Sequence, residues 1–304
     1  MIEITNQKYI KMINAYNEEY ARLYNQLLDK QKSDSESNHD ASAIENEVIN
    51  SIQEWFNKPF SEEYLGITPD FIIDSIENIN DAIELGSYAA ILCNNDIPDQ
   101  IKIKLGSFGS KGVQRIEESI LKFDWEYSID DTDHLNDSLV ISSYLKLLGE
   151  WQYYEGKERL IEKFTHAENP NEIISEAMRT YLCLCGDVTI SAIITCLRGD
   201  LAKKAGLSVA SEYLLIALAD IGKNKPSDEV FSCLRDCFRK MKNRVIGAIC
   251  IGDYGEGRGV QVLKGWLDQH PEENDRQLVS EILSSIKRLG GDISDVQHRL
   301  KLTR

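Results

Sequence analysis

Two stretches, ALADIGK at residues 217–223 and CIGDYGEGRGVQVLKGWL at residues 250–267, decide the fold prediction. In each, a helix-like apolar segment ends with the same five-residue signature. The signature consists, in order, of an aliphatic residue, two variable residues, an apolar residue and a glycine. After the glycine of the second stretch, Val260, Leu263 and Leu267 are spaced by three and four residues, which places them on one helical stripe. The glycine fits the left-handed conformation that ends a helix before the chain turns back. The pattern predicts antiparallel helices joined at the glycine.

The same signature recurs along the chain, and its copies end at Gly109, Gly149, Gly186, Gly222, Gly255 and Gly290. Successive glycines are separated by 40, 37, 36, 33 and 35 residues. A helix pair repeated at this spacing buries its apolar stripe only by stacking on its neighbours. The sequence therefore predicts an all-α fold, a right-handed α-solenoid of stacked helix pairs, in which these glycines have a structural role.

Composition agrees with a helical chain. Only 19 glycines and 6 prolines occur among 304 residues, and this scarcity of turn formers argues against a many-stranded sandwich. No uninterrupted apolar run approaches the 18 residues of a transmembrane helix, so we expect none. The seven cysteines lie mostly in apolar runs, and the N-terminal sequence lacks a secretory pattern. We therefore expect reduced thiols and a cytoplasmic protein.

The net charge of −16 is unevenly distributed. Residues 1–170 contain 15 Lys and Arg against 32 Asp and Glu, whereas residues 171–304 contain 19 against 18. An acidic front half repels nucleic acid and anionic membranes, so we expect neither as a partner, and it favours a basic protein partner. Simple solubility is the alternative explanation of this charge.

The stretch Leu214–Leu267 resembles HEAT-repeat proteins, notably the short bacterial kind, and the resemblance covers roughly residues 97–304. It implies an α-solenoid that binds other macromolecules without catalysis, cofactor or metal. Asp253 and Arg258 lie where such repeats often carry an acid and a base that tie neighbouring turns together, so the resemblance implies a structural role for both. The spacing is slightly shorter than the ~40–47 residues of long HEAT units.

The N-terminal region differs from the repeats. Residues 1–32 form a predicted amphipathic helix, residues 33–42 a polar linker, and residues 43–96 irregular helical repeats. In the helix, Tyr9, Ile13, Tyr16, Tyr20, Leu23 and Leu27 follow the 3.5-residue period of a coiled-coil seam. The seam either caps the chain's own repeats or joins two chains in a homodimer. We expect the cap and a monomer, because tyrosine hydroxyls suit a half-exposed surface.

Three groups of residues are candidates for partner binding. If the second helix of each pair lines the inner surface, the helix Arg276–Leu289 contributes Gln277, Glu281, Ser284 and Lys287. A basic concentration comprises Arg235, Arg239, Lys240, Lys242 and Arg244, although cations near a helix C-terminus also oppose the helix dipole. An aromatic group comprises Trp151, Tyr153 and Tyr154, which either form a hot spot or pack on a neighbouring repeat.

The sequence contains no recognisable catalytic or metal-binding motif. Neither GDYGEGRG at residues 252–259 nor GSFGSKG at residues 106–112 has the spacing of a phosphate-binding loop. We predict a non-catalytic protein-binding scaffold or adaptor. The alternative is a helical-repeat enzyme or nucleic-acid-binding protein resembling alkylation-repair DNA glycosylases, for which Trp151, Trp266 and the Arg235–Arg244 cluster are the available residues. A bilin lyase built from such repeats is a weaker alternative.

Overall fold

The protein is described here by a computed structural model covering residues 6–33, 41–60, 66–94, 96–126, 132–167, 169–203, 207–271 and 275–294. Of these residues, 79% are helical and none lies in a strand, which confirms the all-α prediction. The chain forms two compact units, one of Met1–Phe123 with Thr132–Tyr144 and the other of Asp124–Asp131 with Leu145–Arg304. Helix α7 (Thr132–Glu150) contributes to both units.

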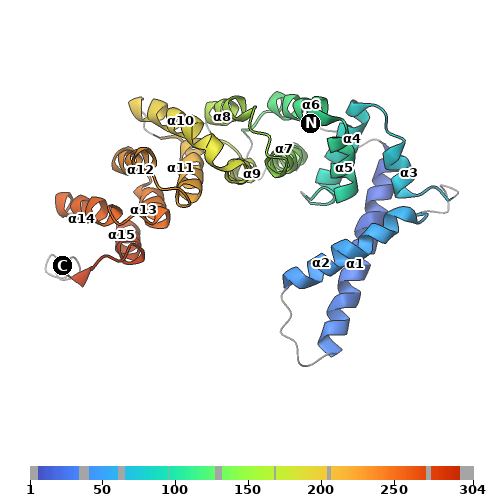
Figure 1. The fold of residues 1–304 in the computed structure, drawn as a ribbon, viewed down its shortest axis with the longest axis horizontal. Coiled ribbons are helices and arrows are strands. Elements are labelled where there is room, and N and C mark those ends of the chain that lie inside the picture. Colours follow the sequence, from blue (N-terminus) through green and yellow to red (C-terminus); the bar gives the residue numbers. More distant parts are fainter. Residues whose placement is uncertain are drawn as a thin grey trace. The chain divides into compact units, whose positions relative to one another are not determined.

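The first unit contains the N-terminal helices and the first part of α7. Its elements are α1 (Gln7–Ser33), α2 (Ala41–Ile52), η1 (Gln53–Asn57), α3 (Pro69–Asp74), α4 (Ile79–Leu92), α5 (Asp99–Ser107) and α6 (Gly109–Lys122). Helix α1 packs against α2 and α4 (Figure 1). Of the predicted linker, Ser33 ends α1 and Ala41 begins α2, and the residues between them lie outside the described part.

The seam of α1 is buried against its own unit at the N-terminal end of the helix. Tyr9 and Ile13 are 8% and 1% exposed. The Tyr16 ring lies 5.9 Å from that of Trp55 and 5.7 Å from that of Phe56. Further along α1, Leu23 and Leu27 are half-buried. The first half of the seam therefore supplies core contacts to the first unit.

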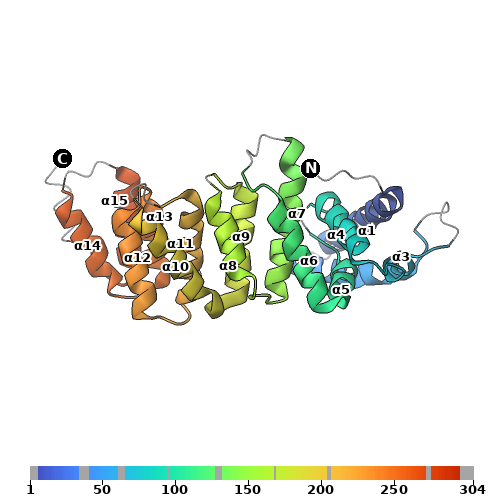
Figure 2. The same ribbon diagram turned by 90° about the horizontal axis from the view of Figure 1, so that it is seen from above.

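The second unit arranges its helices in two rows (Figure 2). The first row, in which neighbours pack side by side, comprises α9 (Glu172–Cys185), α11 (Val209–Gly222), α13 (Arg244–Tyr254) and α15 (Arg276–Arg288). The second comprises α8 (Lys157–His166), α10 (Ile190–Ala202), α12 (Asp228–Lys240) and α14 (Gly259–Gln269). Helices α10, α12 and α14 each pack against the first-row helix that follows them.

Side-chain caps and buried leucines explain why these segments are helical. The Ser208 and Ser227 hydroxyls accept backbone N–H groups at the starts of α11 and α12, which satisfies donors that a helix leaves unpaired. Leu214 and Leu218 of α11 are fully buried. At the turn between α10 and α11, the buried Asp200 carboxylate accepts hydrogen bonds from Ser211 and Lys203 and joins the two helices.

The signature glycines have two different roles. Gly186, Gly255 and Gly290 follow helix ends with positive φ of 71°, 80° and 76°. Gly255 adopts the predicted left-handed conformation, whereas Gly186, with ψ of −145°, does not. Gly109, with φ of 59°, begins α6. Gly149 and Gly222 instead lie within α7 and α11. A Cβ atom at Gly222 would lie 2.8 Å from a Val230 methyl, and one at Gly149 would lie 2.9 Å from a Leu184 methyl. The left-handed prediction is wrong for these two, which allow close helix packing.

One described stretch, Glu172–Ala202, is long and apolar enough to cross a membrane by length and composition. In the structure this stretch is divided, because α9 ends at Cys185 and η3 (Gly186–Thr189) precedes α10. Both α9 and α10 pack against α11. The stretch is therefore weak evidence for a membrane span. It meets a criterion of mean hydropathy over 18 residues, whereas the sequence prediction considered only uninterrupted apolar runs.

Candidate functional site

The first row presents a stripe of half-buried side chains on α11. Tyr213, Ile216 and Asp220 are spaced by three and four residues, and Glu212 lies four residues before Ile216, so the four share one side of the helix. The fully buried Leu214, Leu215 and Leu218 occupy other sides. This stripe and its counterparts on α9 and α13 form what we call the first-row face, which comprises Glu172, Glu176, Arg179, Glu212, Tyr213, Ile216, Asp220, Ile249 and Asp253.

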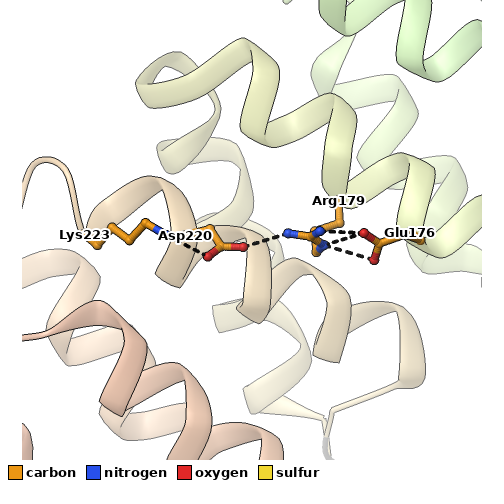
Figure 3. Close-up of polar contacts among 4 residues, drawn as sticks. All are labelled: Glu176, Arg179, Asp220 and Lys223. Carbon is orange, nitrogen blue, oxygen red and sulfur yellow. Dashed lines mark hydrogen bonds and ion pairs between the residues drawn. The ribbon is translucent and has the colours of Figure 1, made fainter. Parts of the chain in front are cut away.

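Four charged residues cross from α9 to α11 on this face (Figure 3). The Arg179 guanidinium donates to Asp220 at 2.7 Å and to Glu176 at 2.5 Å. Lys223 donates to the other Asp220 oxygen at 3.2 Å. The hydrogen bonds from Arg179 to Glu176 raise the pKa of Arg179, with further contributions from nearby charges. The cluster joins two neighbouring helices by alternating charges.

A pocket of about 370 Å³ lies beside this charged cluster. It is lined by Arg179, Cys183, Gly186, Asp187, Asp220, Ile221, Lys223 and Asn224. Among its lining residues, Asp220 is bound by Arg179 and Lys223, whereas Asp187 is paired at 3.2 Å with Lys225, which lies outside the lining. Burial raises the pKa of the Cys183 thiol, which disfavours the reactive thiolate.

The carboxylates of the face act on its tyrosine and on a buried cysteine. Burial, followed by the charges of Glu172, Glu176 and Glu212, raises the pKa of Tyr213. Burial is also the first cause of the raised pKa of Glu212, which the hydrogen bond from Asn243 at 3.2 Å opposes. Beneath the face, burial and the charges of Asp253 and Asp220 raise the pKa of Cys250. Carboxylates of α9 and α11 therefore act on Tyr213, and carboxylates of α11 and α13 act on Cys250.

The candidate residues of α15 lie in the same row as this face. Gln277, Ser284 and Lys287 are exposed, and Glu281 is half-buried. The Glu281 carboxylate accepts a hydrogen bond from Arg288 at 2.8 Å, and Arg288 also lies 3.6 Å from Asp253 of α13. Their predicted binding role stays a prediction.

The basic candidates lie at the end of α12 and the start of α13. Arg235 is paired with Asp236 at 2.9 Å, whereas Arg239, Lys240 and Lys242 are exposed. The Arg244 guanidinium lies 5.7 Å from the centre of the Trp266 ring, and Trp266 is 6% exposed. The structure thus brings Arg244 and Trp266 together.

The aromatic candidates lie between α7 and α8. The Tyr153 carbonyl accepts a hydrogen bond from the Tyr181 hydroxyl of α9 at 2.8 Å. Trp151 is half-buried, and Tyr154 is 43% exposed. This turn therefore packs partly on the first row while leaving one ring accessible.

Asp253 and Arg258, to which the resemblance assigns structural roles, each contact a neighbouring element rather than each other. Arg258 is paired with Glu256 and, at 2.7 Å, with Asp228 at the start of α12. Its guanidinium also lies 4.5 Å from the centre of the Phe231 ring. Asp253 meets Arg288 of α15 at 3.6 Å.

Tyr213, Glu212 and the Arg179–Asp220 pair are absent from the candidates that the sequence provided. The three- and four-residue spacing on α11 could have identified a stripe, but only the packing of α9 beside α11 shows which charges meet. Among the described residues, no group of three or more His, Cys, Asp or Glu side chains is arranged to hold a metal ion. Comparison of the chain with protein-family models, with curated proteins and with solved structures finds no match in any of the three.

Proposed function

We propose that the chain is a non-catalytic scaffold, a HEAT-like α-solenoid that binds a basic protein partner through the first-row face. The observation that carries this proposal is a face that runs from α9 through α11 to α13, with apolar residues flanked by carboxylates. Tyr213, Ile216 and Ile249 are half-buried rather than buried, so part of each side chain remains available for contact. Interfaces between proteins combine such an apolar centre with a polar rim.

The stacking of the second unit supports the solenoid interpretation. Each first-row helix packs on the next, and a copy of the glycine signature lies at the C-terminal end of each of these helices. Figure 1 shows the first row on the inside of the bend that the second unit follows. In stacked-helix proteins, a concave surface of this kind is the usual binding surface.

The experiment is affinity purification of the tagged protein from its native cell at low and at high salt. A Glu172→Lys, Asp253→Lys variant reverses two exposed charges of the first-row face. The matched control, Glu162→Lys with Asp268→Lys, makes the same charge change on exposed residues of α8 and α14. We expect to recover a specific partner whose retention decreases at high salt. The control variant should retain this partner, and the face variant should lose it. Equal retention by both variants would refute binding through this face.

A further inference from the structure

We propose that the first-row face around Tyr213 binds a short peptide segment of the partner in which Lys or Arg residues alternate with apolar ones, with one cationic side chain lying over the Tyr213 ring. This inference rests on the proposed function and names the chemistry of the partner and the residue at the centre of its site.

The apolar part of the site comes from two neighbouring helices. Tyr213 and Ile216 lie three residues apart on the half-buried stripe of α11. Helix α13, which packs beside α11, presents the half-buried Ile249 four residues before Asp253. A tyrosine ring beside aliphatic side chains offers the partner a rigid contact with few rotamers to immobilise.

The charged part of the site comes from carboxylates of α9 and α11. Glu172 and Glu176 project from α9, Glu212 precedes Tyr213 on α11, and the negative charge of all three acts on the phenol. The Arg179 cation also acts on this ring, but it is already bound to Glu176 and Asp220. A cation from the partner therefore meets an excess of negative charge.

These two features together select a cation rather than an anion. A Lys or Arg side chain over the face of a tyrosine is attracted by the ring, and flanking carboxylates strengthen that attraction. A phosphate group or an acidic peptide is repelled by the same carboxylates. The alternating apolar residues of the proposed segment would contact Ile216 of α11 and Ile249 of α13.

The test measures fluorescence anisotropy of a fluorescein-labelled peptide built from repeated Lys-Leu-Arg-Leu blocks, added to the full-length protein. Two further probes replace every Lys and Arg by Glu, or every Leu by Ser. The variants are Tyr213→Ala, Tyr213→Phe, which keeps the ring, and Glu212→Gln, which keeps the side-chain shape. Controls are Phe71→Ala, at an exposed aromatic ring of α3 outside the face, and Glu229→Gln on α12. Circular dichroism confirms that each variant is folded.

We expect saturable binding of the basic peptide that weakens about tenfold with Tyr213→Ala, is retained with Tyr213→Phe, and weakens with Glu212→Gln. Both control variants should bind the basic peptide like the wild type, and the Glu-substituted probe should not bind. These results separate binding at Tyr213 from general attraction of a basic peptide to an acidic protein. Equal binding by Tyr213→Ala and the wild type, or stronger binding of the acidic probe, would overturn the inference. The proposed function would survive that outcome if the face variant still lost its cellular partner, so the two failures are distinguishable.

Discussion

Arg179 of α9 lies 2.7 Å from Asp220 of α11, and the same guanidinium is held by Glu176 one turn away on its own helix. Each of Arg179 and Asp220 has a side chain that is 28% exposed, so the contact is partly shielded from solvent. The sequence places these residues 41 positions apart. Their meeting is a direct consequence of stacking α9 beside α11.

We expect this ion pair to stabilise the second unit modestly. A double-mutant cycle with Arg179→Met and Asp220→Asn should give a coupling free energy of roughly 1 kcal/mol in urea unfolding. The coupling should decrease in high salt, because the pair is partly exposed. A coupling of zero would show that the ion pair contributes nothing to the packing of α9 on α11.

Glycine packing between α13 and α15 gives a prediction with a definite sign. A Cβ atom at Gly252 would lie 2.7 Å from the hydroxyl oxygen of the buried Ser285, so Gly252→Ala should destabilise the protein by about 1–3 kcal/mol. Gly265 of α14 is the matched control, because its Cβ would meet nothing within 4 Å. Gly265→Ala should stabilise by about 0.5–1 kcal/mol through helix propensity. Chemical unfolding of both variants checks this, and equal effects would contradict the described packing.

The pKa of Glu212 predicts a pH-dependent stability difference. Because burial raises the pKa of Glu212, the folded state binds its proton more tightly than the unfolded state. The resulting stabilisation is fully present below the unfolded pKa of about 4.3 and is lost as pH rises through the folded pKa. Glu212→Gln should therefore be more stable than the wild type near pH 7, and the difference should shrink near pH 4. A less stable variant near pH 7 would refute this assignment.

Removal of residues 1–32 tests the role of α1. The deletion removes the rings and aliphatic groups that cover Trp55, Phe56 and Tyr88, so we expect a lower melting temperature and reduced solubility. Light scattering should show a monomer before and after truncation. A dimer that dissociates on truncation, with an unchanged melting temperature, would instead support association through the seam.

Local patterns predicted the helices well, because an apolar stripe and a helix-ending glycine are properties of neighbouring residues. Gly186, Gly255 and Gly290 have the positive φ that glycine allows, and Gly255 adopts the expected left-handed conformation. Gly149 and Gly222 share the same signature, yet they serve close packing against Leu184 and Val230, which only the fold brings near. A local motif cannot distinguish a glycine required by its own φ from one required by a neighbouring helix.

The candidate site was less accessible to sequence reasoning for the same reason. The basic and aromatic groups stand out along the chain, whereas Tyr213 is a single residue inside an apolar run. Its significance comes from Glu172 and Glu176, which belong to another helix. The charge balance of a face depends on which helices are neighbours, and that information lies in the packing.

Site-specific photo-crosslinking in the native cell tests the central claim, partner binding through the first-row face, most directly. A photoreactive amino acid replaces Ile216 on that face or, as the control, the exposed Gln261 on α14. We expect a discrete crosslinked partner from position 216 that is absent from position 261. Crosslinking to the same partner from position 261 alone would refute binding through the first-row face and place the binding surface on the second row.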